Sequence, residues 1–300
     1  MVDGFLVFFN FYLMPGLVLG SIYALGAIGV SLIFGILRFA HFAHGDLMTL
    51  GAYLALSLVA GLGLGPLVAL PLAMIGTIVI SFGIDRLFYK PFRDKSTILL
   101  VIASFGVALM LRSLIMVIWG VDIETYSQGI QRPLVFFDTV RIAERHIWII
   151  VLTIGLMLGV HWILTRTRIG KAMRAVSDSP ELARLAGIST ERVVQATWVI
   201  GGALAAAAGV FIGWDTQLQS TMGWNLLLPI FAATILGGIG RPYGAMVGGL
   251  IIGLAEELSS YPWIGTEPLL SPGYKTGIAF AIMVAMLIWR PSGLFRGRVY

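Results

Sequence analysis

The sequence predicts an all-α polytopic membrane protein with eight to nine transmembrane helices, broken or hairpin segments and a cytoplasmic coupling helix. Of its 300 residues, 58% are hydrophobic and 12% are charged, whereas soluble domains are about 45–50% apolar and about 25% charged. Apolar runs long enough to cross a hydrocarbon core of roughly 30 Å recur along the chain. We therefore expect a single transmembrane domain over residues 1–300. The lack of cysteine excludes disulfides, thiol chemistry and cysteine-based zinc sites.

Hydropathy and helix-breaking residues divide the chain into nine candidate spans. They lie near residues 11–36, 46–61, 66–84, 97–119, 147–164, 192–213, 225–239, 244–260 and 274–289. Eight crossings result if one of the short segments enters and leaves the membrane on the same side. Nine crossings place the two termini on opposite sides.

The positive charges orient these spans. Most of the 20 Lys and Arg residues fall on one side, namely Arg38, Arg86, Lys90, Arg93, Lys95, Arg166, Arg168, Lys171, Arg174, Arg184, Arg192, Arg241, Arg290, Arg296 and Arg298. Arg132, Arg141, Arg145 and Lys275 fall on the other side. Because Lys and Arg concentrate in cytoplasmic loops, this pattern predicts a cytoplasmic C-terminus and an external N-terminus.

One sustained charged stretch, residues 166–191, interrupts the apolar chain between two spans. Ser179 can cap a short helix that starts at Pro180 and carries Glu181 in its first turn, where a negative charge suits the helix dipole. Gly187 is a candidate C-cap of this helix, and Thr190 a candidate N-cap of the next span. A short, capped, solvent-facing helix between two spans predicts a docking surface, and therefore a multi-subunit assembly.

Glycine is abundant, with 37 residues, and several glycines recur four residues apart. The pairs are Gly16/Gly20, Gly155/Gly159, Gly209/Gly213, Gly244/Gly248 and Gly249/Gly253. Such spacing lets helix backbones approach closely where lipid gives no hydrophobic drive for association. We interpret these glycines as packing residues of a compact bundle.

Two segments, residues 20–56 and 231–258, interrupt an apolar helix with glycine or polar residues before a second helix follows. Broken helices at membrane depth occur against protein or a water-filled cavity, because the freed backbone groups need partners. Transporters use such breaks to line substrate paths. Around Gly237, Gly238 and Gly240, a tight hairpin and a path-lining role both fit the pattern.

Polar side chains gather at the first break. His41, His44 and Asp46 are too few ligands for a metal site, so we predict none. A hydrogen-bonded turn fits better, in which Asp46 caps the following helix and the imidazoles satisfy freed carbonyls. Arg112, which lies within a span, is a candidate functional residue because charge is costly there. Its place toward the outer end of the span also fits a side chain that snorkels to the interface.

Missing motifs narrow the function further. The chain has no phosphate-binding loop of the G-x-x-x-x-G-K-[ST] type, no H-E-x-x-H and no G-x-S-x-G. It is therefore expected to be neither an ATPase nor an intramembrane hydrolase, and to carry no cofactor. An ion-coupling relay is poorly supported, because Glu256 and Glu257 fall at an outer helix end and Asp46 at an inner one. We expect the driving energy to arrive through the charged cytoplasmic segment.

Four motifs resemble one family: the permease subunits of bacterial branched-chain amino acid ABC importers, of the shorter, H-type class. They are GSIYALGAIGVSLIFGILRFAHFAHGDLMTLGAY, TRIGKAMRAVSDSPELARLAGIST, FAATILGGIGRPYGAMVGGLIIGLAEELSS and WRPSGLF, in the family's order and spacing. The resemblance covers nearly the whole chain. The family usually has N-F-A-H-G at the first break, and here His41 replaces the Asn.

The resemblance implies a permease subunit in a bacterial inner membrane that translocates branched-chain or other neutral amino acids. It implies a second homologous permease subunit (or a second copy), two cytoplasmic subunits that bind ATP-Mg, and an extracytoplasmic binding protein. By position, the candidates for the translocation path are Phe42, His44, Gly45, Asp46, Gly237, Gly238 and Gly240. Those for coupling to the ATPase are Gly170, Arg174, Asp178, Glu181, Ala183 and Gly187.

Three other functions remain. Relatives of this family carry urea or short amides, so the substrate class stays open between these and amino acids. A self-contained channel or secondary carrier is a second alternative, which the ATP dependence of uptake distinguishes. An intramembrane enzyme is a third, disfavoured by the missing catalytic motifs.

Overall fold

A computed structural model describes residues 2–127, 134–136, 140–263 and 270–295. A π-helical turn, Phe9–Leu13, joins the first two helices into one long rod. The helices are α1 (Val2–Phe8), α2 (Met14–Leu37), α3 (His44–Leu62), α4 (Pro66–Ile84), α5 (Thr97–Trp119), α6 (Glu144–Arg166), α7 (Arg168–Asp178), α8 (Pro180–Leu185), α9 (Thr190–Asp215), α10 (Met222–Gly237), α11 (Pro242–Leu258) and α12 (Lys275–Trp289). Two short antiparallel strands, β1 (Leu134–Phe136) and β2 (Val140–Ile142), precede α6.

Each of the nine candidate spans coincides with a helix. By length and composition, six helical segments in the described part of the chain could cross a membrane: residues 6–37, 44–62, 66–92, 97–119, 144–166 and 190–215. The last three helices are shorter, with α10 at 16 residues, α11 at 17 and α12 at 15. The protein is thus a helical, multi-pass membrane protein.

The centre of the bundle is α2, most of which is buried between α9 and α11. Glycines make this close packing possible. A Cβ on Gly253 would overlap the backbone of Gly20, and one on Gly249 would overlap Ala24. In four of the five predicted glycine pairs, at least one glycine is in tight contact with another helix. The exception is Gly155 and Gly159 of α6, where a Cβ would have no neighbour within 4 Å.

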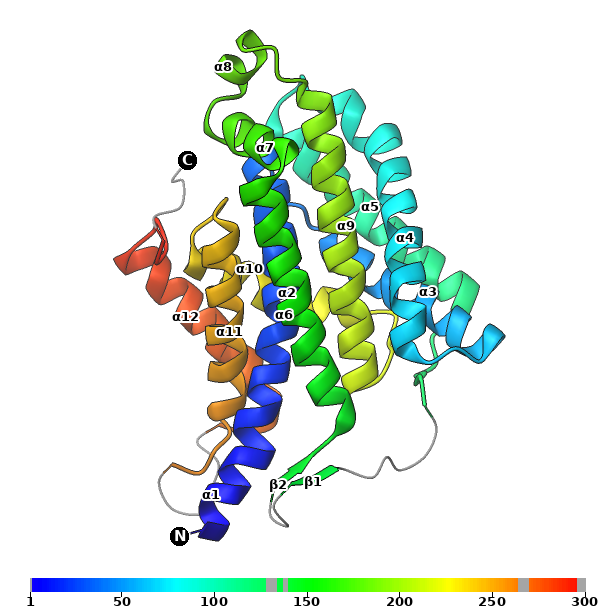
Figure 1. Ribbon diagram of the computed structural model, residues 1–300, viewed down its shortest axis with the longest axis vertical. Helices are drawn as coiled ribbons and strands as arrows, with labels where there is room; N and C mark the ends of the chain where they lie inside the picture. Colours follow the sequence, from blue (N-terminus) through cyan, green and yellow to red (C-terminus); the bar gives the residue numbers. More distant parts are fainter. Residues whose placement is uncertain (1, 128–133, 137–139, 264–269, 296–300) are drawn as a thin grey trace.

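The helices α7 and α8 lie at one end of the bundle, opposite to the N-terminus (Figure 1). Several of the basic residues gather at this end, which we call the α8 end. Lys90 and Arg93 both pair with Glu191 at the start of α9, at 3.0 and 2.8 Å. Arg132, Arg296 and Arg298, which belong to the predicted charge pattern, lie outside the described residues.

Two helices begin inside the bundle instead of at its surface. The imidazole of His44, the first residue of α3, packs on Gly29, about 12 Å along α2 from its last residue at 1.5 Å per residue. Gly223 at the start of α10 meets Gly45 so closely that a Cβ on either residue would overlap the other's carbonyl. Asp46 lies in the first turn of α3, at a helix end as predicted, but this end is buried inside the bundle.

Candidate functional site

The first break is a return of the chain into the bundle between α2 and α3. It begins at Arg38, whose φ of 58° ends α2 in a left-handed conformation. The amides of Phe42 and Ala43 then both donate to the Ser104 hydroxyl of α5, at 2.6 and 3.2 Å. These bonds satisfy backbone donors just before the N-terminus of α3, which begins without a side-chain cap. The predicted cap by Asp46 is wrong, since Asp46 lies inside the first turn.

Asp46 is fully buried and forms a bidentate ion pair with Arg112 of α5. The Arg112 Nε lies 3.0 Å from one carboxylate oxygen, and Nη2 lies 3.1 Å from the other. The guanidinium carbon also stands 4.9 Å from the ring centre of Trp224 on α10. Because a charge at a helix centre in a bilayer costs about 2.5–3.5 kcal/mol, a buried partner explains how Arg112 is tolerated. Snorkelling is therefore wrong as an account of Arg112, which turns inward.

His41 and His44 lie in a buried aromatic cluster, and Nε2 of His41 faces a tyrosine hydroxyl instead of a backbone carbonyl. His41 Nε2 is 2.9 Å from the Tyr89 hydroxyl, and its ring packs edge-on against Trp198 with centres 5.1 Å apart. Tyr89 stacks on Trp198 at 5.4 Å. His44 is 5.9 Å from His41 by ring centres and has no exposed surface. Within the described residues, no group of three potential metal ligands is found.

Phe42 belongs to a partly exposed aromatic patch, unlike the other residues of the first break. Its ring stacks on Phe105 of α5 with centres 4.2 Å apart and lies 5.3 Å from Phe231 of α10. Phe105 is 38% exposed and Trp224, 6.1 Å from it, is 36% exposed. We call Phe42, Phe105, Trp224 and Phe231 the α5–α10 face. Arg112 reaches this face beside Trp224, with 16% of its side chain exposed.

The second break is a tight helical hairpin between α10 and α11. Gly237 ends α10, and Gly238 and Gly240 adopt φ values of 108° and 75° that favour glycine. The C-terminal segment holds the hairpin, because the amides of Leu294 and Phe295 donate to the carbonyls of Leu236 and Gly237. Of the two interpretations of this break, the hairpin describes its shape. A path-lining role for its glycines stays a prediction.

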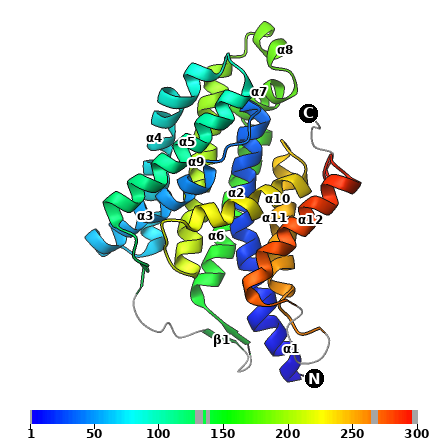
Figure 2. The ribbon, with the colours of Figure 1, turned by 180° about the vertical axis from the view of Figure 1, so that it is seen from behind.

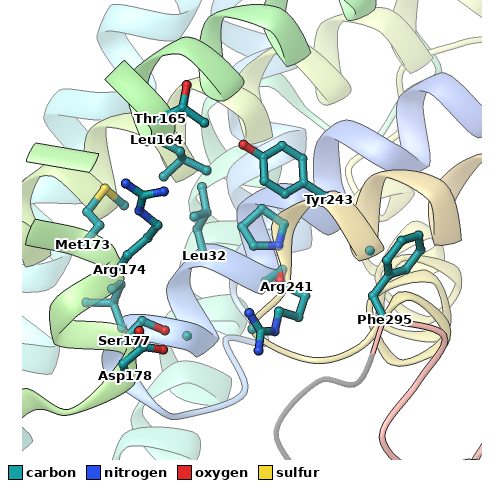
Figure 3. A pocket seen from close by; sticks show the side chains of 16 residues that line it. Leu32, Leu164, Thr165, Met173, Arg174, Ser177, Asp178, Arg241, Tyr243 and Phe295 are labelled. Carbon is teal, nitrogen blue, oxygen red and sulfur yellow. The ribbon is translucent and has the colours of Figure 1, made fainter. Parts of the chain in front are cut away.

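A cavity of about 370 Å³ separates this hairpin from the charged segment (Figure 3). Arg174, Ser177 and Asp178 of α7 form one wall, and Arg241 and Tyr243 form the other. Leu32 of α2 and Leu164 of α6 close it from the bundle side. The structure therefore brings together Arg174, Asp178 and Gly240, which the sequence assigned to two separate sites.

The charged segment folds into two short helices, α7 and α8, of which α8 is the predicted one. The Ser179 hydroxyl accepts a bond from the Leu182 amide at 3.4 Å and caps α8, which starts at Pro180. Gly187, with a φ of 79°, follows the helix as its C-terminal glycine. Thr190 is not the cap of α9 but its first residue, after Ser189. Gly170 packs α7 on the end of α6, where a Cβ would overlap Ile163 and Leu164.

The outer surface of α8 differs from the predicted one. Arg174, Asp178 and Glu181 are exposed, but Ala183 is only 4% exposed and faces the protein's own interior. The exposed apolar residues are Leu182 and Leu185, at 67% and 85%. A partner at this end therefore meets two leucines, with Ala183 behind them.

Several features of the site were not predicted from the sequence, although Asp46 and Arg112 were each singled out as candidates. No sequence pattern around Trp224 or Gly223 indicates a role for them, because their importance comes from contacts with α5 and α3. The Asp46–Arg112 pair was predictable, because two opposite charges in an apolar chain are expected to form an ion pair. Leu182 and Leu185 were also predictable, because they are apolar residues on a short helix rich in charge.

The comparisons with known proteins agree with this architecture. A family model described as branched-chain amino acid transport system / permease component matches residues 12–287. The chain is 33% identical over 310 residues to the high-affinity branched-chain amino acid transport system permease protein LivH of Escherichia coli (strain K12), covering 98% of this chain and 97% of that protein. It is 30% identical over 295 residues to the corresponding protein BraD of Pseudomonas aeruginosa, covering 94% of each.

A solved structure shares the fold. PsaBC from Streptococcus pneumoniae in complex with Fab superposes with a TM-score of 0.53, over 97% of this chain and 96% of that chain. The identity is 15%, so this likeness concerns the arrangement of the helices alone.

Proposed function

Because the chain belongs to the branched-chain amino acid transport permease family of ABC transporters, we propose that it is the membrane subunit of an ATP-driven importer for branched-chain or other neutral amino acids. The observation that carries this proposal is the α7–α8 segment, a capped and charged structure with two exposed leucines at the end of the bundle where basic residues gather. Such a segment suits a docking contact with a soluble partner. Urea or short amides are the second candidate substrate class, and a self-contained channel or carrier is the less favoured alternative.

The proposal assigns the chemistry to the partners. This chain forms one permease domain over residues 1–300, carries no cofactor and leaves ATP hydrolysis to two cytoplasmic subunits, which bind ATP-Mg and dock on residues 166–191. Leu182 and Leu185 make the apolar part of that contact, with Arg174, Asp178 and Glu181 around it. An extracytoplasmic binding protein delivers the substrate to the opposite end.

A second membrane subunit covers the α5–α10 face, and the path runs between the two. The support for this placement is the partial exposure of Arg112 on that face, because a charged group at membrane depth is expected to face protein or water and not lipid. Phe42 and Asp46 of the predicted path lie at this face or directly behind it. His44 and Gly45 support it from the buried side, where Gly45 fixes the crossing with α10.

We expect nine crossings in a bacterial inner membrane, with the N-terminus outside and the α8 end in the cytoplasm. Single cysteines are informative because the chain has none of its own. Ser127→Cys and Lys171→Cys, both at exposed positions, are expected to react with an impermeant maleimide from opposite sides of the membrane. Labelling of both positions from outside in intact cells contradicts the orientation.

Docking of the ATPase is tested by photo-crosslinking in the native complex. A photoreactive phenylalanine analogue at Leu185 is expected to yield a covalent adduct with an ATP-binding subunit, identified by mass spectrometry after tagging this chain. The same analogue at Leu62, which is 67% exposed at the far end of α3, serves as the control and is expected to give no such adduct. Adducts from Leu62 but not from Leu185 contradict the proposed docking site.

A further inference from the structure

The Asp46–Arg112 pair offers one set of hydrogen-bond donors that the protein does not use. Its two hydrogen bonds employ Nε and Nη2 of the guanidinium. In the part of the chain that the structure describes, the third nitrogen, Nη1, makes no hydrogen bond. An arginine presents five N–H donors in a fixed fork, so Nη1 keeps two of them for another acceptor.

The surroundings of Nη1 fix what this acceptor can be. Asp46, without exposed surface, holds the guanidinium from behind, and Trp224 packs over its plane at 4.9 Å. The side chain is 16% exposed and lies beside Trp224 on the α5–α10 face. Figure 2 shows α5, α10 and α12 on the same side of the molecule. At this face the Nη1 donors of the ion-paired Arg112 lie beside the rings of Phe42, Phe105 and Trp224, a combination that suits a small anionic group carrying an apolar tail.

The depth of the pair places this group within the membrane. Arg112 lies about 22 Å along α5 from its first residue and about 10 Å from its last, at 1.5 Å per residue. A carboxylate that passes there in a water-poor environment needs hydrogen-bond donors, and arginine is the side chain that binds carboxylates with the best geometry.

We infer that Arg112 is a substrate-contacting residue of the translocation path, whose Nη1 donors hold the α-carboxylate of an amino acid in transit. Asp46 is the positioning residue that keeps the guanidinium aimed at the path, and the aromatic rings beside it contact the apolar side chain of the substrate. This inference rests on the proposed function, and it favours amino acids over urea and amides, which carry no carboxylate.

The test measures the electrostatic field in the path with thiol reagents of opposite charge. Leu109 is 59% exposed and lies one helical turn from Arg112 on the same side of α5. Leu114 is 47% exposed but lies on the opposite side of α5, by the 100° step of the helix. In the native complex, Leu109→Cys is expected to react with water-soluble methanethiosulfonates. The ratio of the rate of the anionic ethylsulfonate reagent to that of the cationic ethylammonium reagent is expected to be higher at Leu109→Cys than for a free thiol in solution. Leu114→Cys is expected to react with neither.

Replacing the ion pair by two amides shows whether Arg112 acts in the path or only stabilises the structure. In Leu109→Cys combined with Asp46→Asn and Arg112→Gln, two amides replace the ion pair and keep a hydrogen bond, and size-exclusion chromatography checks assembly. The preference for the anionic reagent is expected to fall to the ratio of the rates of the two reagents with a free thiol, because the guanidinium donors are gone. Adding an excess of leucine and its binding protein is expected to slow the labelling of Leu109→Cys only while Arg112 is present.

Two results overturn the inference. One is a Leu109→Cys thiol that does not react in an assembled complex, and the other is an anion preference that is unchanged without Arg112. ATP-driven uptake is recorded for each variant in the same preparation. Normal ATP-driven uptake together with either result rejects the role of Arg112 and leaves the proposed importer function standing.

Discussion

Gly223→Ala is expected to lower the yield of assembled protein and its midpoint of thermal unfolding. The added Cβ would overlap the carbonyl oxygen of Gly45 and the hydroxyl of Thr49, where α10 crosses α3 inside the bundle. Backbone atoms cannot yield as a flexible side chain can, so the two helices must separate. Separation also breaks the hydrogen bond from the Gly223 amide to Thr49, which is 3.0 Å long. Overpacking in a core costs about 1–3 kcal/mol and occasionally more, against a total stability of about 5–15 kcal/mol.

The measurement is the yield of monodisperse protein in mild detergent and its midpoint of thermal unfolding. Gly155→Ala is the matched control, since a Cβ there has no neighbour within 4 Å. The control is expected to behave as the unchanged protein, because alanine is also the better helix former. A Gly223→Ala protein with unchanged yield and midpoint would show that α3 and α10 do not cross at these glycines.

The double substitution of Leu182→Asp and Leu185→Asp is expected to stop uptake while the permease stays folded. Both side chains point away from the protein, so their loss disturbs no internal packing. If docking buries each leucine at about 1.5 kcal/mol, the two losses add to about 3 kcal/mol, which weakens ATPase binding roughly a hundredfold. The measurements are the amount of ATPase subunit that co-purifies with this chain and the uptake of radiolabelled leucine in cells.

Leu62→Asp, of similar exposure and away from α8, is the control and is expected to leave both quantities unchanged. Ala183→Glu is expected to act differently, because Ala183 is buried behind α8 and a charge there unfolds the segment itself. Full co-purification and uptake in the double variant would remove α8 from the docking contact.

Local features of the chain were predictable from the sequence. The helices follow from long apolar runs, and the boundaries of α8 follow from Ser179, Pro180 and Gly187, whose effects are confined to one turn. Even the glycine pairs indicated close packing at four of five places. The prediction was wrong for Gly155 and Gly159, because spacing alone does not tell which side of a helix contacts a neighbour.

Depth and pairing were not predictable in the same way. Hydropathy shows that a segment is apolar, but it does not show that α3 and α10 start in the middle of the bundle. That depth comes from contacts between residues far apart in the chain, such as Gly45 with Gly223. The same holds for Asp46, whose role as a cap was a local interpretation and whose partner Arg112 is 66 residues away. The geometry of the site therefore depends on contacts between residues far apart in the chain, whereas the bounds of its helices depend on the local sequence.

ATP-driven uptake by the purified complex tests the central claim most directly. The complex is isolated through a tag on this chain, reconstituted into proteoliposomes and given its binding protein with radiolabelled leucine outside. Accumulation of leucine above the external concentration is expected only with ATP-Mg at the cytoplasmic face, and not with a non-hydrolysable analogue. Equal uptake without ATP, which stops when the inside and outside concentrations match, would contradict the account and identify a channel or a passive carrier.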